Sequence, residues 1–136
     1  MAKNRPLKSA HGWTAMLWIT RGLLQVASLL FDHTARVAPL DLVVPFLANY
    51  DAAGKLALGL GTIGLDLFVV VAITGWLRGR IGARTWIWIH RLGYLAFATL
   101  FLHALLGGSD FSSPLVSALT WSTAFAIGLL TLGRFP

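Results

Sequence analysis

The sequence predicts an all-α integral membrane protein, with residues 1–136 forming a single transmembrane domain of four bundled helices. The first observation is composition: 57% of the residues are hydrophobic, only 12% are charged, and the mean hydropathy is +0.73. A soluble domain of this length needs a far more polar surface. The second observation is the pattern, because four apolar stretches approach the ~20 residues that a helix needs to cross a bilayer. We predict helices at residues 11–31, 55–77, 86–106 and 115–133.

The chain is basic, with a formal net charge of +6, which in a soluble protein would suggest nucleic-acid binding. In an apolar chain, basic residues at helix ends instead indicate topology, because positively charged loops stay in the cytoplasm. If the N-terminus is cytoplasmic, Arg36 and Lys55 are the only basic loop residues on the outer side of the membrane. The basic residues on the inner side are Lys3, Arg5, Lys8, Arg78, Arg80, Arg84 and Arg134. We therefore expect a multi-pass protein with both termini cytoplasmic and no nucleic-acid partner.

The first predicted helix, residues 11–31, follows a short basic arm at residues 1–10 and carries two polar side chains in its body. Arg21 and Gln25 are four residues apart, so they share one face of the helix. A charge at this depth must face protein, water or a cofactor rather than lipid. Arg21 therefore snorkels, bonds to backbone carbonyls of a neighbouring helix, or binds a cofactor carboxylate. The following loop, residues 32–54, has an apolar centre that we expect to lie in the membrane interface as a short helix.

The second predicted helix, residues 55–77, has a face of small residues, which lets helix backbones approach closely in a membrane. This face consists of Gly59, Gly61 and Gly64. Asp66 lies in the middle of the same helix. Pairing of Asp66 with Arg21 would neutralise two costly groups at once.

The third predicted helix, residues 86–106, carries a histidine near each end, His90 and His103. Histidine is costly inside a bilayer and usually marks function there. Their separation of thirteen residues corresponds to roughly 20 Å along a helix, which is room for two stacked sites. At 100° per residue the two rings lie about 140° apart, so they share a face only if the helix bends. Gly93 offers one place for a bend.

His11 and His90 form the candidate site near the inner face. The first and third helices run in the same direction, because the second returns between them, so both histidines lie at similar depth. Two imidazoles that face each other on neighbouring helices are the axial ligand set of a b-type haem. Six-coordinate iron of this kind favours electron transfer over oxygen binding. For His11 the alternative is an ordinary polar residue at the start of a helix.

At the outer end His103 lacks an equivalent partner, because the matching position on the first helix is Gln25. Glutamine is a poor iron ligand, and His33 could replace it only if its loop folds back. We therefore expect one haem b, since the second site lacks a pair of histidines. The alternatives for His103 are a hydrogen bond to a neighbouring helix, a place at the outer interface, or ligation of a (bacterio)chlorophyll magnesium, which needs a single axial ligand.

Several motifs resemble the ferric reductase-like transmembrane family in its bacterial branch. Residues 90–110, HRLGYLAFATLFLHALLGGSD, are similar to the fifth-helix motif of that family. LDLVVPF at residues 40–46, GLGTIGLDLFVVVAITGWLRGRIGARTW at residues 59–86 and the order of spans are also similar. The resemblance covers most of the chain from His11 onward.

The resemblance implies a bundle with two haems, each held by one histidine from each of two parallel helices. Carried over to this chain, His11 with His90 would hold the inner haem, and His103 would be one ligand of the outer haem. The chain departs from the family in its missing first helix, in Gln25, and in having no flavin- or NADPH-binding domain after Pro136. We therefore expect a truncated, partly degenerate member in a bacterial cytoplasmic membrane, at most the haem-bearing component of an oxidoreductase. Its electrons would come from a donor protein, a quinone or a partner complex.

Two functions are consistent with these patterns. The first is a haem b protein that carries electrons across the membrane, as a subunit or with redox partners. The second is a cofactor-poor accessory subunit of a larger respiratory or photosynthetic complex, favoured by the missing helix and soluble domains. In both, the partners are membrane lipid and other membrane proteins. The candidate cofactor-binding residues are His11, His90, His103, Arg21 and Gln25, of which the three histidines are the candidate metal ligands.

Overall fold

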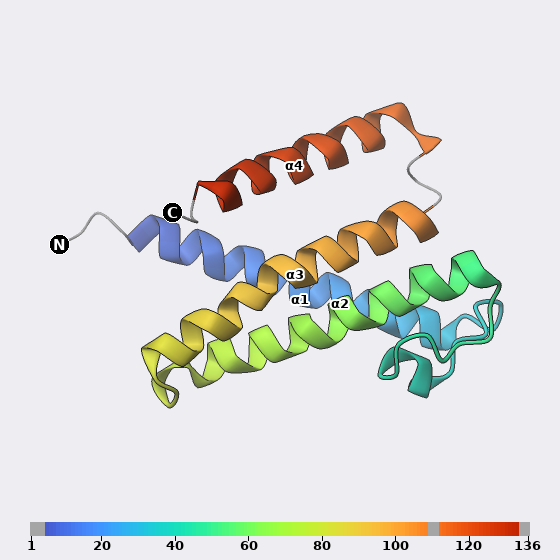
Figure 1. The fold of residues 1–136 in the computed structure, drawn as a ribbon, viewed down its shortest axis with the longest axis horizontal. Coiled ribbons are helices and arrows are strands. Elements are labelled where there is room, and N and C mark those ends of the chain that lie inside the picture. The colour runs from blue at the N-terminus through green and yellow to red at the C-terminus, as the bar shows by residue number, and fades with distance from the viewer. Residues whose placement is uncertain (1–4, 109–111, 134–136) are drawn as a thin grey trace.

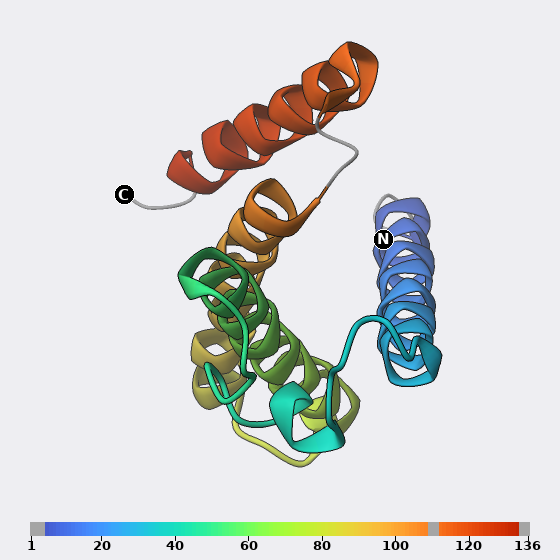
Figure 2. The same ribbon diagram turned by 90° about the vertical axis from the view of Figure 1, so that its right-hand side faces the viewer.

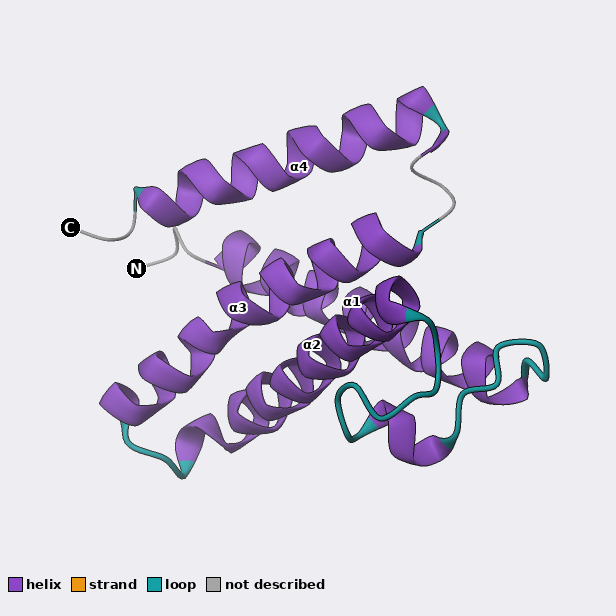
Figure 3. Ribbon diagram, turned by 45° about the vertical axis from the view of Figure 1, so that its right-hand side comes forward, coloured by secondary structure: helices purple, strands orange, loops and turns teal. Residues whose placement is uncertain are grey.

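The computed structural model describes residues 5–108 and 112–133, and this part of the chain consists of helices and loops without a strand (Figures 1 and 3). Its elements are α1 (Arg5–Phe31), the 3-10 helix η1 (Pro39–Leu42), α2 (Ala52–Trp76), the 3-10 helix η2 (Leu77–Gly79), α3 (Ala83–Gly107) and α4 (Pro114–Leu132). The predicted all-α class is therefore confirmed, and the short helix predicted in the first long loop is η1.

The predicted helix bounds agree with the observed ones to within three residues, except at the start of the first helix. α1 begins at Arg5 rather than at residue 11, so the prediction of a non-helical arm is wrong from Arg5 onward. Residues 1–4 lie outside the described chain. Nothing in this segment opposes a helix: Pro6 lies in the first turn, where its missing N–H is not needed, and leucine, lysine and alanine are good helix formers.

Three segments are long and apolar enough to cross a membrane: His11–Phe31, Ala52–Gly79 and Ala83–Gly107. The apolar stretch of α4, Pro114–Leu129, is shorter. These segments support the predicted class of membrane protein, whereas a fourth span stays a prediction. Of the basic residues that predict the orientation, Lys3 and Arg134 lie outside the described chain.

α2 and α3 form the most closely packed helix pair of the protein, and the predicted glycine face of α2 makes this approach possible. A Cβ added at Gly64 would lie 2.6 Å from Leu100 Cγ, and one added at Gly61 would lie 2.7 Å from His103 Nδ1. Small residues at such positions let two backbones come together in a membrane. Gly59, the third member of the predicted face, has a different neighbour: the ring of Phe46 fills the space beside it.

The loop between α1 and α2 is fastened to the face of α2 that lies opposite α3. Thr62 donates a hydrogen bond through Oγ1 to the backbone carbonyl of Asp41 over 2.8 Å. The Asp41 carboxylate is buried and accepts a hydrogen bond from the Ala38 backbone N–H, also over 2.8 Å. Asp51 ends the loop as the N-cap of α2, because its carboxylate accepts a hydrogen bond from the Gly54 backbone N–H.

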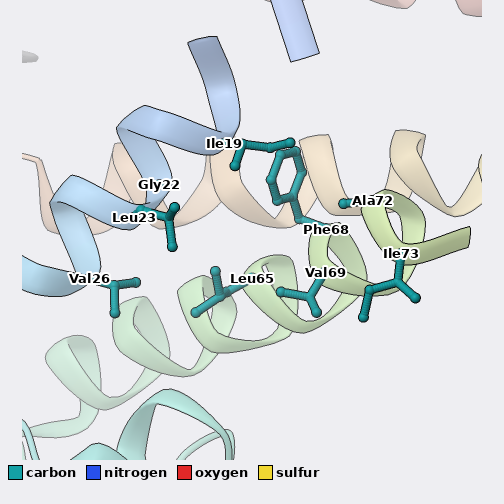
Figure 4. A pocket seen from close by; sticks show the side chains of 9 residues that line it. All are labelled: Ile19, Gly22, Leu23, Val26, Leu65, Phe68, Val69, Ala72 and Ile73. Atoms are coloured by element: carbon teal, nitrogen blue, oxygen red, sulfur yellow. The ribbon is translucent and has the colours of Figure 1, made fainter. Parts of the chain in front are cut away.

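α1 and α4 flank the α2–α3 pair (Figure 2), and ring contacts join each of them to α3: His11 with His90, and Trp121 with Phe101. An apolar cleft of about 150 Å³ lies between α1 and α2, with Ile19 at the end where Ala72 lies and Val26 at the end where Leu65 lies (Figure 4). A second apolar cleft, of about 310 Å³, lies between α3 and α4. No large side chain is fully buried in the described chain. Many of the large apolar side chains are therefore exposed on the surface of the described chain.

Candidate functional site

The structure brings His11 of α1 and His90 of α3 together at the ends where both helices begin. Their ring centroids are 6.0 Å apart and their planes are inclined by 79°. The side chain of His11 is exposed and that of His90 is half-buried. The two helices contribute one imidazole each, as expected from their parallel course.

This separation suits a metal ion between the rings. Imidazole nitrogens bind transition metals at about 2 Å, so two opposed rings on one ion have centroids about 6 Å apart. In the T-shaped arrangement the edge of one ring meets the face of the other. One imidazole must therefore turn about its side-chain torsion before both rings direct a nitrogen at the same point. Such a turn changes a rotamer.

His90 lies against a second aromatic ring, which sequence reasoning did not include in the site. Trp86 stacks on His90 with centroids 4.8 Å apart and planes 15° apart. The guanidinium of Arg78 lies 4.4 Å from the centre of the Trp86 ring, as a cation–π contact. The spacing of four residues between Trp86 and His90 was the available signal, because residues i and i+4 share a helix face.

One nitrogen of His90 lacks a partner in the described chain. Nδ1 of His90 is buried and has no hydrogen bond there, and the same holds for Nε1 of Trp86. A buried polar atom without a partner is destabilising and needs an explanation, such as a bound ion. A metal-bound His90 would use one ring nitrogen for the ion, and the arrangement therefore fits a ligand role.

His103 has a different environment, on the side of α3 that faces α2. Its Nδ1 lies 2.8 Å from the backbone carbonyl of Ala57, and the ring is half-buried against Gly61. A carbonyl can only accept, so neutral His103 carries its proton on Nδ1 and presents Nε2 as an acceptor. The predicted alternative of a hydrogen bond to a neighbouring helix therefore describes His103 as the structure has it. His90 therefore contacts α1 and His103 contacts α2, in agreement with the predicted angular separation of the two histidines.

The remaining candidate residues stay outside this cluster. Arg21, Gln25 and His33 are exposed, and no described contact joins them to His11, His90 or His103. In the described chain Arg21 also forms no ion pair with Asp66, so the predicted pairing of these two residues is wrong for this structure. The physical reason is direction, because the side chain of Arg21 does not lie on the face of α1 that borders α2.

No group of three or more histidine, cysteine or acidic side chains gathers in the described residues. A metal ion bound by protein side chains alone usually takes four ligands. A haem iron takes only its axial ligands from the protein, so a pair such as His11 and His90 suits haem better than a bare ion.

The chain matches no protein-family model, no curated protein and no solved structure. The resemblance to the ferric reductase-like family therefore stays a prediction.

Proposed function

We propose that this protein is a haem b-binding membrane protein of ferric reductase-like type that takes part in electron transfer across a bacterial cytoplasmic membrane. In this proposal α4 is a fourth span and both termini are cytoplasmic. The observation that carries the proposal is the contact between His11 and His90, 6.0 Å apart on two parallel helices. The motifs of residues 90–110 and 59–86 support the same function by resemblance.

His11 and His90 would hold the haem, which supplies one-electron redox chemistry when bound. Trp86 would fix the plane of the His90 ring through the stack at 4.8 Å. The cation of Arg78, 4.4 Å from the Trp86 ring, adds positive charge near the site. Positive charge favours the more reduced, more negative state of a nearby redox group. A donor protein, a quinone or a partner subunit would deliver the electrons.

Purification of the full chain in detergent, after expression with added haem precursor, tests this function. We expect a reduced-minus-oxidised difference spectrum typical of a low-spin b-type haem. His90→Ala and His11→Ala should each abolish the band, because each removes one of the two imidazoles that would hold the haem. His33→Ala is the matched control, since His33 is exposed in the turn after α1 and should leave the band unchanged. A wild-type sample that inserts and folds but shows no haem band would contradict the proposal.

A second function is favoured by the loose packing of the outer helices. α1 and α4 border apolar clefts, and large apolar side chains such as Trp13 and Leu115 are 72% and 70% exposed. Such surfaces suit a cofactor-poor accessory subunit of a larger respiratory or photosynthetic complex. In a photosynthetic host, the free Nε2 of His103 would suit a (bacterio)chlorophyll magnesium. Isolation from native membranes in a stable stoichiometric complex, without extractable haem, would favour this function.

A further inference from the structure

Two charged side chains of opposite sign lie near the middle of the membrane-crossing segments. Arg21 is the central residue of the span His11–Phe31, and Asp66 lies at the centre of the span Ala52–Gly79. A charge at this depth faces protein or a water-filled cavity rather than lipid. Within the described chain neither side chain has an ion-pair or hydrogen-bond partner. No described residue of the same copy therefore supplies the partner of either charge.

Asp66 points away from the chain's own neighbour α3. Gly61 and Gly64 face α3, and at 100° per residue Asp66 lies about 170° round α2 from them. Asp66 lies one turn after Thr62. Thr62 marks the face of α2 that binds the loop between α1 and α2, because its hydroxyl donates a hydrogen bond to the carbonyl of Asp41. The side chain of Asp66 remains half-exposed there.

Arg21 points away from α2. The cleft face of α1 consists of Ile19, Gly22, Leu23 and Val26. At 100° per residue, Arg21 lies about 150° from the middle of that face. Its side chain is exposed, and the guanidinium lies on a different surface of the molecule from the one that carries Asp66.

The two charges lie at nearly the same depth. Val26 and Leu65 share one end of the cleft between the antiparallel helices α1 and α2, which places Arg21 about one turn, or roughly 6 Å, from the level of Asp66 (Figure 4). A long, flexible arginine side chain spans this difference. In copies inserted with the same orientation, an Arg21 and an Asp66 can therefore meet.

We propose that copies of this chain associate in the membrane head to tail, with Arg21 of one copy paired to Asp66 of the next. One copy supplies one cation and one anion at mid-membrane depth, so its two neighbouring copies complement both charges without another component. A different partner would have to carry its own acid and its own base at this depth. In the low dielectric of the membrane a direct pair of opposite charges attracts strongly.

The directions of the two side chains determine the type of assembly. A two-fold dimer brings the same patch of both copies together, so it would need Arg21 and Asp66 in one patch. They lie on different faces, and the contact is therefore heterologous. Such contacts close into a ring or extend into a chain, with more than two copies in either case.

Single cysteines give a direct test, because the chain contains no cysteine of its own. Leu17 lies one turn from Arg21 and Ile73 lies two turns from Asp66, both on the inner side, so the two side chains lie at nearly the same depth. They are 66% and 50% exposed. The full chain would be co-expressed as a Leu17→Cys variant and an Ile73→Cys variant with different tags, then oxidised in the membrane. We expect a mixed disulfide that joins the two tags, because facing residues at one depth of two contacting helices bring their Cα atoms within the roughly 7 Å that a disulfide can bridge.

Arg21→Gln, placed in one or the other of the two cysteine variants, distinguishes this contact from any other. Arg21→Gln in the Leu17→Cys chain should reduce the mixed disulfide about tenfold or more, since it leaves the Asp66 carboxylate of the neighbour unpaired. The same Arg21→Gln in the Ile73→Cys chain should leave the yield nearly unchanged, because that arginine belongs to another junction. Helix content and the amount of inserted chain provide the folding control for every variant.

Leu129→Cys on α4, where the side chain is 54% exposed, replaces Ile73→Cys as the negative control for random collision. Three results would overturn the proposal. The first is no mixed disulfide between the Leu17→Cys and Ile73→Cys chains. The second is equal loss from either placement of Arg21→Gln. The third is a disulfide that forms within one chain when both cysteines are placed in it.

Discussion

Substitution of Gly64 by alanine is the sharpest test of the packing between α2 and α3. A Cβ at this position would lie 2.6 Å from Leu100 Cγ and 2.9 Å from Thr99 Oγ1. Ordinary contacts between carbon atoms are about 3.5–4.0 Å, so either α3 moves by roughly 1 Å or Leu100 leaves its rotamer. Overpacking of this kind costs about 1–3 kcal/mol, whereas removal of a helical glycine contributes about 0.5–1 kcal/mol in favour of the helix. We expect a net loss of about 1–2 kcal/mol in the free energy of unfolding.

Gly75→Ala is the matched control, because it makes the same change in the same helix. A Cβ at Gly75 would meet no atom within 4 Å. Only the gain in helix propensity remains, so this variant should be more stable by up to about 1 kcal/mol. Denaturant titration in mixed micelles, followed by tryptophan fluorescence and circular dichroism, measures both variants. If the two substitutions change stability in the same direction and by the same amount, Gly64 is not the close contact described above.

Two further predictions concern single side chains. Trp86→Leu removes the stack on His90 and should weaken haem binding by roughly tenfold, measured as haem retained per protein; Trp88→Leu, on a side chain that is 64% exposed, should not. Hydrogen bonds from the Thr34 hydroxyl and from its backbone N–H lower the pKa of Asp32 below its usual value of 3.8. The turn they form should therefore be fully stabilised above that value and be lost as the pH falls through the lowered pKa. Thr34→Val should raise the NMR titration midpoint of the Asp32 carboxyl, and an unchanged midpoint would show that Thr34 does not stabilise the carboxylate.

The helices could be predicted because each carries its own evidence along the chain. Apolar stretches of about one bilayer thickness place α2 and α3 almost completely. The N-terminal bound of α2 was missed by three residues because Asp51 caps the helix, and Gly54 lies in the first turn, where it reads as part of a loop. Capping depends on one hydrogen bond at a helix end, so hydropathy alone does not locate it.

Contacts between distant segments could not be predicted in the same way. The hydrogen bond from Thr62 to the Asp41 carbonyl joins residues 21 positions apart, and Phe46 fills the space beside Gly59. Glycine spacing indicates that a close approach occurs on a helix face, but not which segment makes it. The pattern therefore predicted Gly61 and Gly64 as contacts of a helix and missed the loop.

The candidate site was predictable only in part, for the same reason. His11 and His90 are brought together by helix order and direction, which hydropathy reveals. The Ala57 carbonyl that binds His103 is a backbone atom, and no residue type in the sequence marks it. A tryptophan near a helix start is common at the membrane boundary, so the position of Trp86 in the sequence does not mark it as part of a site. Its stack on His90 depends on side-chain rotamers that the sequence does not specify.

The two proposals depend on the rotation of α1 about its own axis, and this makes them testable against each other. His11 and Arg21 are ten residues apart, so they lie about 80° apart around a rigid helix. With His11 directed at α3, Arg21 faces away from α2 and from Asp66. Turning α1 far enough to pair Arg21 with Asp66 in the same copy would carry His11 away from His90. The histidine contact and an ion pair within one chain therefore exclude each other, so evidence that Arg21 binds its own Asp66 would remove the site proposed for haem as well as the proposed assembly.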